Sequence, residues 1–237
     1  MALSTKDLKD SGASVRKTIA PGSQTLKINS VNLEPFKFIE NAYHLMLHVE
    51  SEPIKGFEGF LIDQNDPSKG NYEGQIGRVK ANRYAYADGE TKSGIKIERD
   101  RSILMFIKNL CTGLDACEGK NRFVKWFSDQ DGEHETIEDF VDAFDKAIQK
   151  GDEVYMDFCI AGKEYENRNG YINYDMHLPK TNRGEYAFGK ASDGQVAMFS
   201  EENHLVKLPV KDLESFGDNG SDDIEVPDNS SKDFSLD

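Results

Sequence analysis

Cationic and aromatic side chains alternate along one predicted strand, and these are the groups that can bind a single nucleic-acid strand. Between positions 75 and 86 they share one side-chain parity: Arg78, Lys80, Tyr84 and Tyr86. The opposite parity carries glycine and small apolar residues, as expected for a face that packs on a core. Single strands are held by cations that follow the phosphates and by rings that stack on the bases. An ordinary solvated strand with tyrosines packed at its rim is the alternative interpretation.

A second group of the same kind lies between Gly162 and Tyr171. Its candidate nucleic-acid contacts are Lys163, Tyr165, Arg168 and Tyr171. The segment joins the last two predicted strands, and in an OB-fold that loop often contacts the ligand. Asn169-Gly170 also predicts a simple hairpin turn, and Glu164 and Glu166 weaken the case for an anionic ligand.

Motifs of catalysis are absent or weak. The chain has no GxxxxGK[ST], GxSxG or HExxH sequence. His44 and His48 share a predicted strand face without an obvious third metal ligand, so we expect two surface histidines. Glu118-Gly119-Lys120 matches the ExK fragment of some nucleases, but it lies in a predicted loop. We therefore expect a non-enzymatic protein without metal or cofactor.

The segment 211–237 predicts a disordered acidic tail. From Asp212 onward it carries nine acidic residues and one lysine, which is more than half of the net charge of −14. Its few apolar residues cannot bury enough surface to fold. The last residues combine an apolar tip with acids, and we interpret them as a partner-binding motif: Asp233, Phe234, Leu236 and Asp237. A plain solubilising tail is the alternative.

Hydrophobic periodicity predicts the elements that position these groups. Strands are expected at 25–33, 42–50, 57–63, 75–86, 154–160 and 172–178, and helices at 102–114 and 136–150. The first strand changes parity after Ile28, which predicts a β-bulge near Asn29-Ser30. Thr136 is expected to cap the second helix together with Asp139.

Strands followed by helices and then by two more strands indicate a β-rich α+β fold. We expect an OB-fold-like barrel with helices between its third and fourth strands. A generic α+β sandwich has the same order and remains the alternative. The expected organisation is a flexible N-terminal arm at 1–18, an OB-fold-like nucleic-acid-binding domain at 19–210 and the tail at 211–237.

Composition points to an intracellular protein. The three cysteines form no CxxC pair and no even-numbered disulfide framework. No segment has the length of a membrane span, and the first residues lack the apolar core of a signal peptide. We expect a cytoplasmic location without membrane contact, while homo-oligomerisation stays open.

Three segments resemble a protein family of crAss-like and related phages of Bacteroidales. They are Gly56-Phe57-Glu58-Gly59-Phe60, Gly74-Gln75-Ile76-Gly77-Arg78-Val79 and Gly162-Lys163-Glu164-Tyr165. The likeness covers roughly residues 19–180. It implies a single-stranded DNA-binding protein that acts in phage DNA replication or recombination in the host cytoplasm, with replication or recombination proteins as partners of the tail. The rival hypothesis is a protein–protein interaction module, virion-associated or bound to a host factor, that uses the same β-surface.

Overall fold

The fold was analysed in a computed structural model, which describes residues 19–51, 76–170, 172–181, 184–190 and 195–208. Some expectations fall outside these ranges. They concern the N-terminal arm at 1–18, the strand at 57–63, Tyr171, and the tail with Asp233, Phe234, Leu236 and Asp237.

The described residues form nine strands and four helices. In chain order they are β1 (Gly22–Pro35), β2 (Tyr43–Ser51), β3 (Ile76–Lys80), β4 (Gly89–Glu90), β5 (Lys96–Ile97), α1 (Arg99–Glu118), α2 (Phe123–Asp129), α3 (Ile137–Gln149), β6 (Tyr155–Glu166), β7 (Ile172–His177), β8 (Phe188–Gly189), α4 (Glu201–His204) and β9 (Leu205–Val206).

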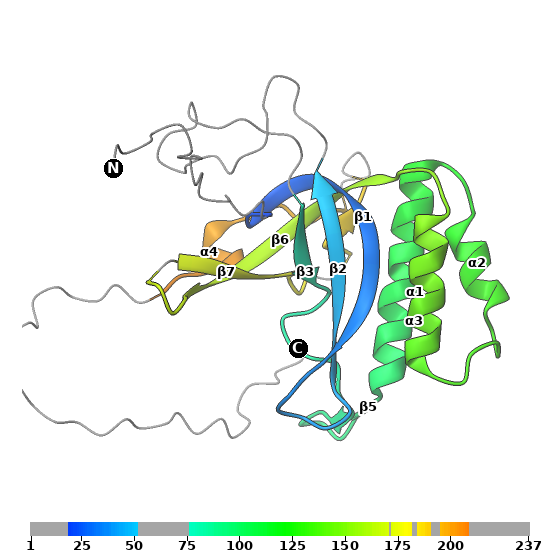
Figure 1. Cartoon of the computed structure of the whole chain (residues 1–237), viewed down its shortest axis with the longest axis horizontal. Coiled ribbons are helices and arrows are strands. Elements are labelled where there is room, and N and C mark those ends of the chain that lie inside the picture. The colour runs from blue at the N-terminus through cyan, green and yellow to red at the C-terminus, as the bar shows by residue number, and fades with distance from the viewer. Residues whose placement is uncertain (1–18, 52–75, 171, 182–183, 191–194, 209–237) are drawn as a thin grey trace, which may run out of the picture.

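Five strands form a closed mixed barrel in the order β1-β2-β3-β7-β6, and β6 pairs back to β1 (Figure 1). The junction of β3 with β7 is parallel, and the other four junctions are antiparallel. Along the chain, α1, α2 and α3 lie between the third and fourth barrel strands, β3 and β6. This arrangement is consistent with an OB-like barrel, and it confirms the predicted β-rich class with helices inserted before the last two barrel strands.

The predicted bulge in the first strand is confirmed, and it bends β1 around the barrel. The register of β1 on β2 shifts between Ile28 and Ser30. Leu26 and Ile28 are buried before the shift, and Val31 is buried after it, so the inward parity changes at the extra residue. Bending lets the two ends of β1 pair with different strands, β6 at Gly22–Lys27 and β2 from Leu26 onward.

The helices form a separate layer on one side of the barrel (Figure 1), in which α3 packs on β1, α1 packs on β6 and β8, and α2 contacts α1. Helix α1 is longer than predicted, because Gly113 lies within it and the chain turns only at Gly119, whose φ of 71° is left-handed. The predicted cap of α3 is confirmed: Thr136 Oγ1 accepts a hydrogen bond from the Asp139 N–H at 3.1 Å. Helix α2 was not predicted.

Two strand boundaries differ from the sequence prediction. The strand expected at 75–86 ends at Lys80, and the chain bends at positions 81–84. Conversely, β6 continues to Glu166, so most of the segment expected to be a loop is paired strand. Residues 188–189 and 205–206 add short strands β8 and β9 to the edges of β6.

Candidate nucleic-acid interface

The two predicted cations of β3 point out of the barrel. Val79 and Ala81 are buried in the core, whereas Arg78 is half exposed and Lys80 reaches the surface. The Arg78 guanidinium pairs with Glu34 of β1. Lys80 Nζ lies 2.7 Å from Asp175 Oδ2 of β7. The predicted alternation of faces is therefore confirmed for this strand, with each cation next to a carboxylate.

The two tyrosines predicted on the same face occupy different environments. Because the strand ends at Lys80, their shared parity no longer places them on one face. Tyr84 is 56% exposed, and the Arg83 guanidinium lies 5.6 Å from the centre of its ring. Tyr86 packs against the core, and its backbone pairs with Tyr43 of β2. Burial raises the pKa of the Tyr86 phenol. Tyr86 thus supports the barrel wall, and the prediction that it lies on the exposed face with Lys80 is wrong.

The residues predicted in the hairpin alternate between the two faces of β6. Lys163 and Tyr165 are exposed, and they lie opposite Asp175 and Asn173 of β7. Glu164 turns to the other side, where it accepts hydrogen bonds from the Leu208 N–H at 2.9 Å and the Tyr174 hydroxyl at 3.4 Å. It is therefore removed from the face that carries Lys163, and it does not oppose an anionic ligand there.

Arg168 lies in the turn that joins β6 to β7. The Gly170 N–H donates to the Asn167 carbonyl at 3.0 Å, and Gly170 takes a φ of 78°. The predicted Asn-Gly turn is confirmed. The turn carries the exposed Arg168 beyond the end of the two strands.

An aromatic loop that the sequence analysis did not select lies at the junction of β1 and β2. Phe38 is 87% exposed and Ile39 is 50% exposed. The Phe36 ring packs edge-on against Phe38 and against His44, with centroids 5.4 and 5.1 Å apart. The loop closes through Asn41, whose φ of 56° is left-handed. The available indication was the Phe-Lys-Phe sequence after Pro35, because large apolar residues in a turn-bounded loop cannot all be buried.

His44 connects this loop to the cations of β3. Burial lowers the pKa of its imidazole, and the charge of Lys80 lowers it further, while Asp175 and Glu34 act in the opposite direction. His44 lies opposite Glu34 in the pairing of β1 with β2. The β1–β2 loop, β2, β3 and β6 thus each present side chains on the outer surface of the barrel. We call this surface the barrel face; its residues are Phe36, Phe38, His44, Arg78, Lys80, Lys163 and Tyr165.

The two histidines of β2 have separate surroundings. His44 packs on Phe36, whereas His48 Nε2 lies 2.8 Å from Asn32 Oδ1. Within the described ranges, no group of three or more His, Cys, Asp or Glu side chains is arranged to hold a metal ion. The geometry therefore gives each histidine a local packing or hydrogen-bonding role.

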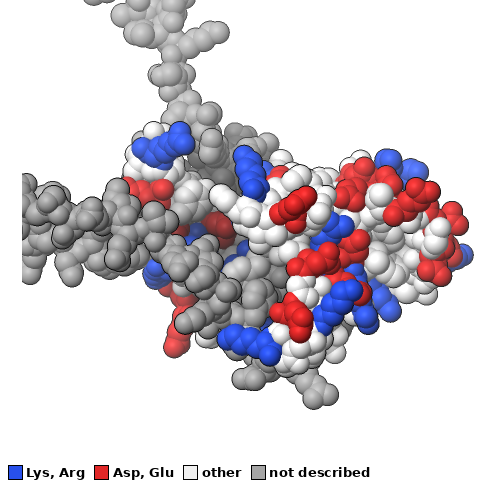
Figure 2. Space-filling view, turned by 90° about the horizontal axis from the view of Figure 1, so that it is seen from below, with Lys and Arg blue, Asp and Glu red and all other residues white. Residues whose placement is uncertain are grey.

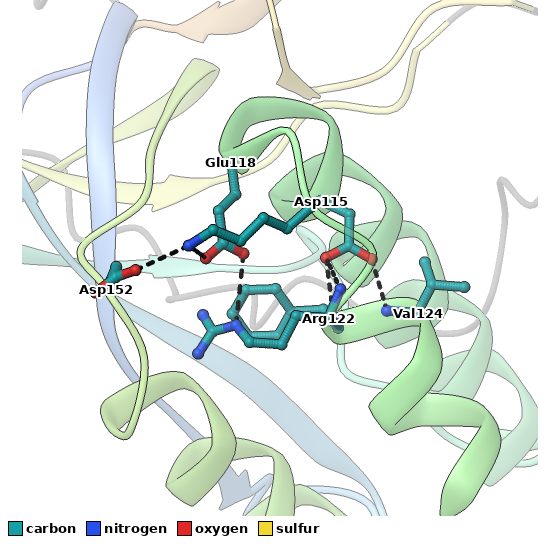
Figure 3. Close-up of polar contacts among 7 residues, drawn as sticks. Asp115, Glu118, Arg122, Val124 and Asp152 are labelled. Atoms are coloured by element: carbon teal, nitrogen blue, oxygen red, sulfur yellow. Dashed lines mark hydrogen bonds and ion pairs between the residues drawn. The ribbon is translucent and has the colours of Figure 1, made fainter.

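The Glu118-Gly119-Lys120 fragment belongs to a polar cluster that joins α1 to α2 (Figure 3). Lys120 Nζ contacts Glu118 at 3.1 Å and Asp152 at 3.0 Å. Hydrogen bonds to Asp152 and then to Glu118 raise the pKa of Lys120, which favours the protonated amine. Arg122 Nε lies 3.4 Å from the second oxygen of Glu118, so both oxygens of this carboxylate face cations.

Asp115 forms the centre of the same cluster, and its role is structural. Its two oxygens accept hydrogen bonds from the backbone N–H groups of Arg122, Phe123 and Val124 at 2.8–3.0 Å. These are the donors at the start of α2 that have no partner within the helix. The cluster in Figure 3 is thus explained by the capping of α2 from α1.

Acidic and basic side chains are interspersed on the surface, and acids gather over the helical layer at the right of Figure 2. In that view the basic side chains lie beside acidic ones instead of forming one broad field. No family model, curated protein or solved structure matches the chain significantly. Among the described residues, none of the helices combines the length and apolar character needed to cross a membrane.

Proposed function

We propose that the chain is a non-enzymatic single-stranded DNA-binding protein with an OB-fold, which holds the strand on the barrel face. One observation carries the proposal: separate segments present exposed aromatic rings and cations on the outer surface of an OB-like barrel. Phe38 is presented by the β1–β2 loop, Lys80 by β3, and Lys163 with Tyr165 by β6. In OB-folds, this face and the loops next to it are the usual place for an oligonucleotide.

Each group has a role that follows from its chemistry. Arg78, Lys80 and Lys163 would contact phosphates along the strand, and Arg168 would contact them at the hairpin. Phe38, Tyr84 and Tyr165 would stack on bases, because all bases offer an aromatic face and stacking tolerates any sequence. A protein that binds DNA through these phosphate and stacking contacts should have little sequence preference.

Replication or recombination of phage DNA in the host cytoplasm is the setting that the sequence resemblance supports. The tail residues Asp233, Phe234, Leu236 and Asp237 would recruit protein partners, and the acids upstream would compete weakly with DNA for the barrel face. Truncation after Val210 should therefore raise DNA affinity at low salt and abolish capture of a replication or recombination protein. Unchanged DNA affinity with every partner retained would reduce the tail to a solubilising segment.

A protein–protein interaction module is the second candidate, and the adjacent exposure of Phe38 and Ile39 favours it. Titration of labelled single- and double-stranded oligonucleotides at increasing salt separates the two functions. The proposed function requires preferential binding of the single strand and a steep loss of affinity with salt. Absence of oligonucleotide binding at low salt would eliminate it in favour of the second candidate.

A further inference from the structure

The cations of β3 on the barrel face are both engaged by carboxylates from neighbouring strands. Arg78 pairs with Glu34 of β1, and Lys80 pairs with Asp175 of β7 at 2.7 Å. The side chains of Glu34 and Asp175 are each 43% exposed, and that of Arg78 is 49% exposed. Both carboxylates and Arg78 are therefore accessible from solution, whereas the side chain of Lys80 is only 21% exposed.

Asp175 has a special position because it lies between two lysines. It accepts a hydrogen bond from Lys80, and it lies directly opposite Lys163 in the pairing of β6 with β7. A carboxylate and a phosphate use the same N–H donors of a cation, so only one of them can occupy a given donor. A phosphate that takes the Lys80 donor now used by Asp175 must displace that carboxylate.

We infer that Glu34 and Asp175 are intramolecular competitors that set the affinity of the barrel face for a polyanion. This inference rests on the proposed function and extends it. A phosphate that takes these donors of Arg78 or Lys80 replaces a carboxylate of the protein. Because the displaced carboxylate takes up counterions while those of the phosphate are released, the affinity of the wild-type protein depends less on salt than its number of cations implies.

The fold itself does not require these pairs. Exposed ion pairs contribute little to stability, because water screens them and two long side chains must be ordered. Lys80 keeps its backbone pairing with β7 when its side chain changes partner, through the hydrogen bond from the Leu178 N–H to the Lys80 carbonyl at 2.8 Å. The two carboxylates can therefore be neutralised in a folded protein.

The test compares Glu34→Gln, Asp175→Asn and the double variant with the wild-type full-length chain. Asp142→Asn is the matched control, because it removes one charge from an exposed site on α3, away from the barrel face. Fluorescence anisotropy with a labelled single-stranded oligothymidine gives the dissociation constant at several salt concentrations. Thermal melting checks that each variant is folded, and Glu34→Gln decides alone if Asp175→Asn does not fold.

We expect each barrel-face variant to bind about two- to five-fold more tightly at low salt, with a steeper salt dependence. Asp175→Asn should have the larger effect, because Asp175 is paired with Lys80 and lies opposite Lys163 on the neighbouring strand, and Asp142→Asn should have none. If Glu34→Gln and Asp175→Asn bind as the wild type does, or if Asp142→Asn strengthens binding equally, the inference is wrong and the proposed function stands. If neither the wild type nor any variant binds, both are wrong.

Discussion

Lys80 and Asp175 meet at the parallel junction that closes the barrel, with 2.7 Å between Nζ and Oδ2. The backbone of Lys80 joins β3 to β7 at the same point, because its carbonyl accepts the Leu178 N–H. The backbone of Lys80 thus closes the barrel, while its side chain forms an ion pair with Asp175.

Lys80→Ala should weaken binding of single-stranded DNA and leave the fold intact. It removes one proposed phosphate contact but retains the hydrogen bond between the Leu178 N–H and the Lys80 carbonyl, which joins β3 to β7. The slope of log affinity against log salt should fall by less than about one, because Asp175 offsets part of the contribution of Lys80. Anisotropy titrations at several salt concentrations measure this slope, and Lys146→Ala on α3 is the matched control. An equal effect of the two substitutions would remove Lys80 from the proposed interface.

Tyr165→Ala should reduce DNA affinity by about 1–3 kcal/mol, because a ring stacked on a base is lost. Tyr186 provides a close control, since both tyrosines are 46% exposed and Tyr186 belongs to a different part of the surface, beside α1 and β8. Binding isotherms for the two variants decide the question. If the Tyr165 and Tyr186 variants bind DNA with equal affinity, the position of Tyr165 on the barrel face gives it no special role in binding.

Asp115→Ala should destabilise the protein by roughly 1–3 kcal/mol, because three backbone N–H groups at the start of α2 lose their acceptor. Chemical denaturation monitored by circular dichroism gives the free energy of unfolding. Asp142→Ala removes a carboxylate that is exposed on α3 and should be nearly neutral. DNA affinity measured well below the melting temperature should not change, because the cluster lies outside the barrel face.

Gly77→Ala should be destabilising, whereas Gly89→Ala should have little effect. A Cβ at position 77 would lie 2.6 Å from Ile19 Cγ1 and 2.8 Å from the Ile19 backbone nitrogen, and Ile19 is almost completely buried. Relief of this overlap requires the backbone to move, at a cost of about 1–3 kcal/mol. A Cβ at position 89 meets no described atom within 4 Å. Thermal melting of the two variants makes the comparison, and equal melting temperatures would contradict the close packing of Ile19 on β3.

Cys111 and Cys159 should resist thiol reagents in the folded protein. Burial raises the pKa of the Cys111 thiol to about 12 and that of Cys159 to about 11. Raised thiol pKa values favour the folded state below the ordinary pKa of 9, and this contribution is lost as the pH rises from about 9 toward 12. Reaction with a chromogenic disulfide at pH 8 should label these two residues only after unfolding. Rapid labelling in the native state would contradict their burial.

Elements set by local chemistry were predictable from the sequence. The parity change after Ile28 indicated the bulge, and Thr136 with Asp139 indicated the start of α3. The inward and outward sides of β3 followed from alternation up to Lys80. In each case, the structural cause lies within a few residues of the pattern.

The candidate site was only partly predictable, because its assembly depends on contacts between distant segments. Tyr86 has the same parity as the exposed residues of β3. The strand ends before it, however, and its backbone forms an isolated β-bridge with Tyr43. Glu164 points away from Lys163 because β6 continues through the segment that was expected to be a loop, and its hydrogen-bond partner Leu208 lies 44 residues later. Exposure of Phe38 likewise depends on how the β1–β2 loop leaves the barrel.

The pairing of β1 with β6 has a consequence for how the protein reaches its fold. Thr25 and Asp157, hydrogen-bonded at 2.6 Å, are 132 positions apart in the chain. The three helices form through local contacts within that interval, so they are available early, whereas closure of the barrel must wait for its two ends to meet. We therefore expect this long-range closure to limit the rate of folding. Until it occurs, β1 and β6 both present open strand edges to other chains.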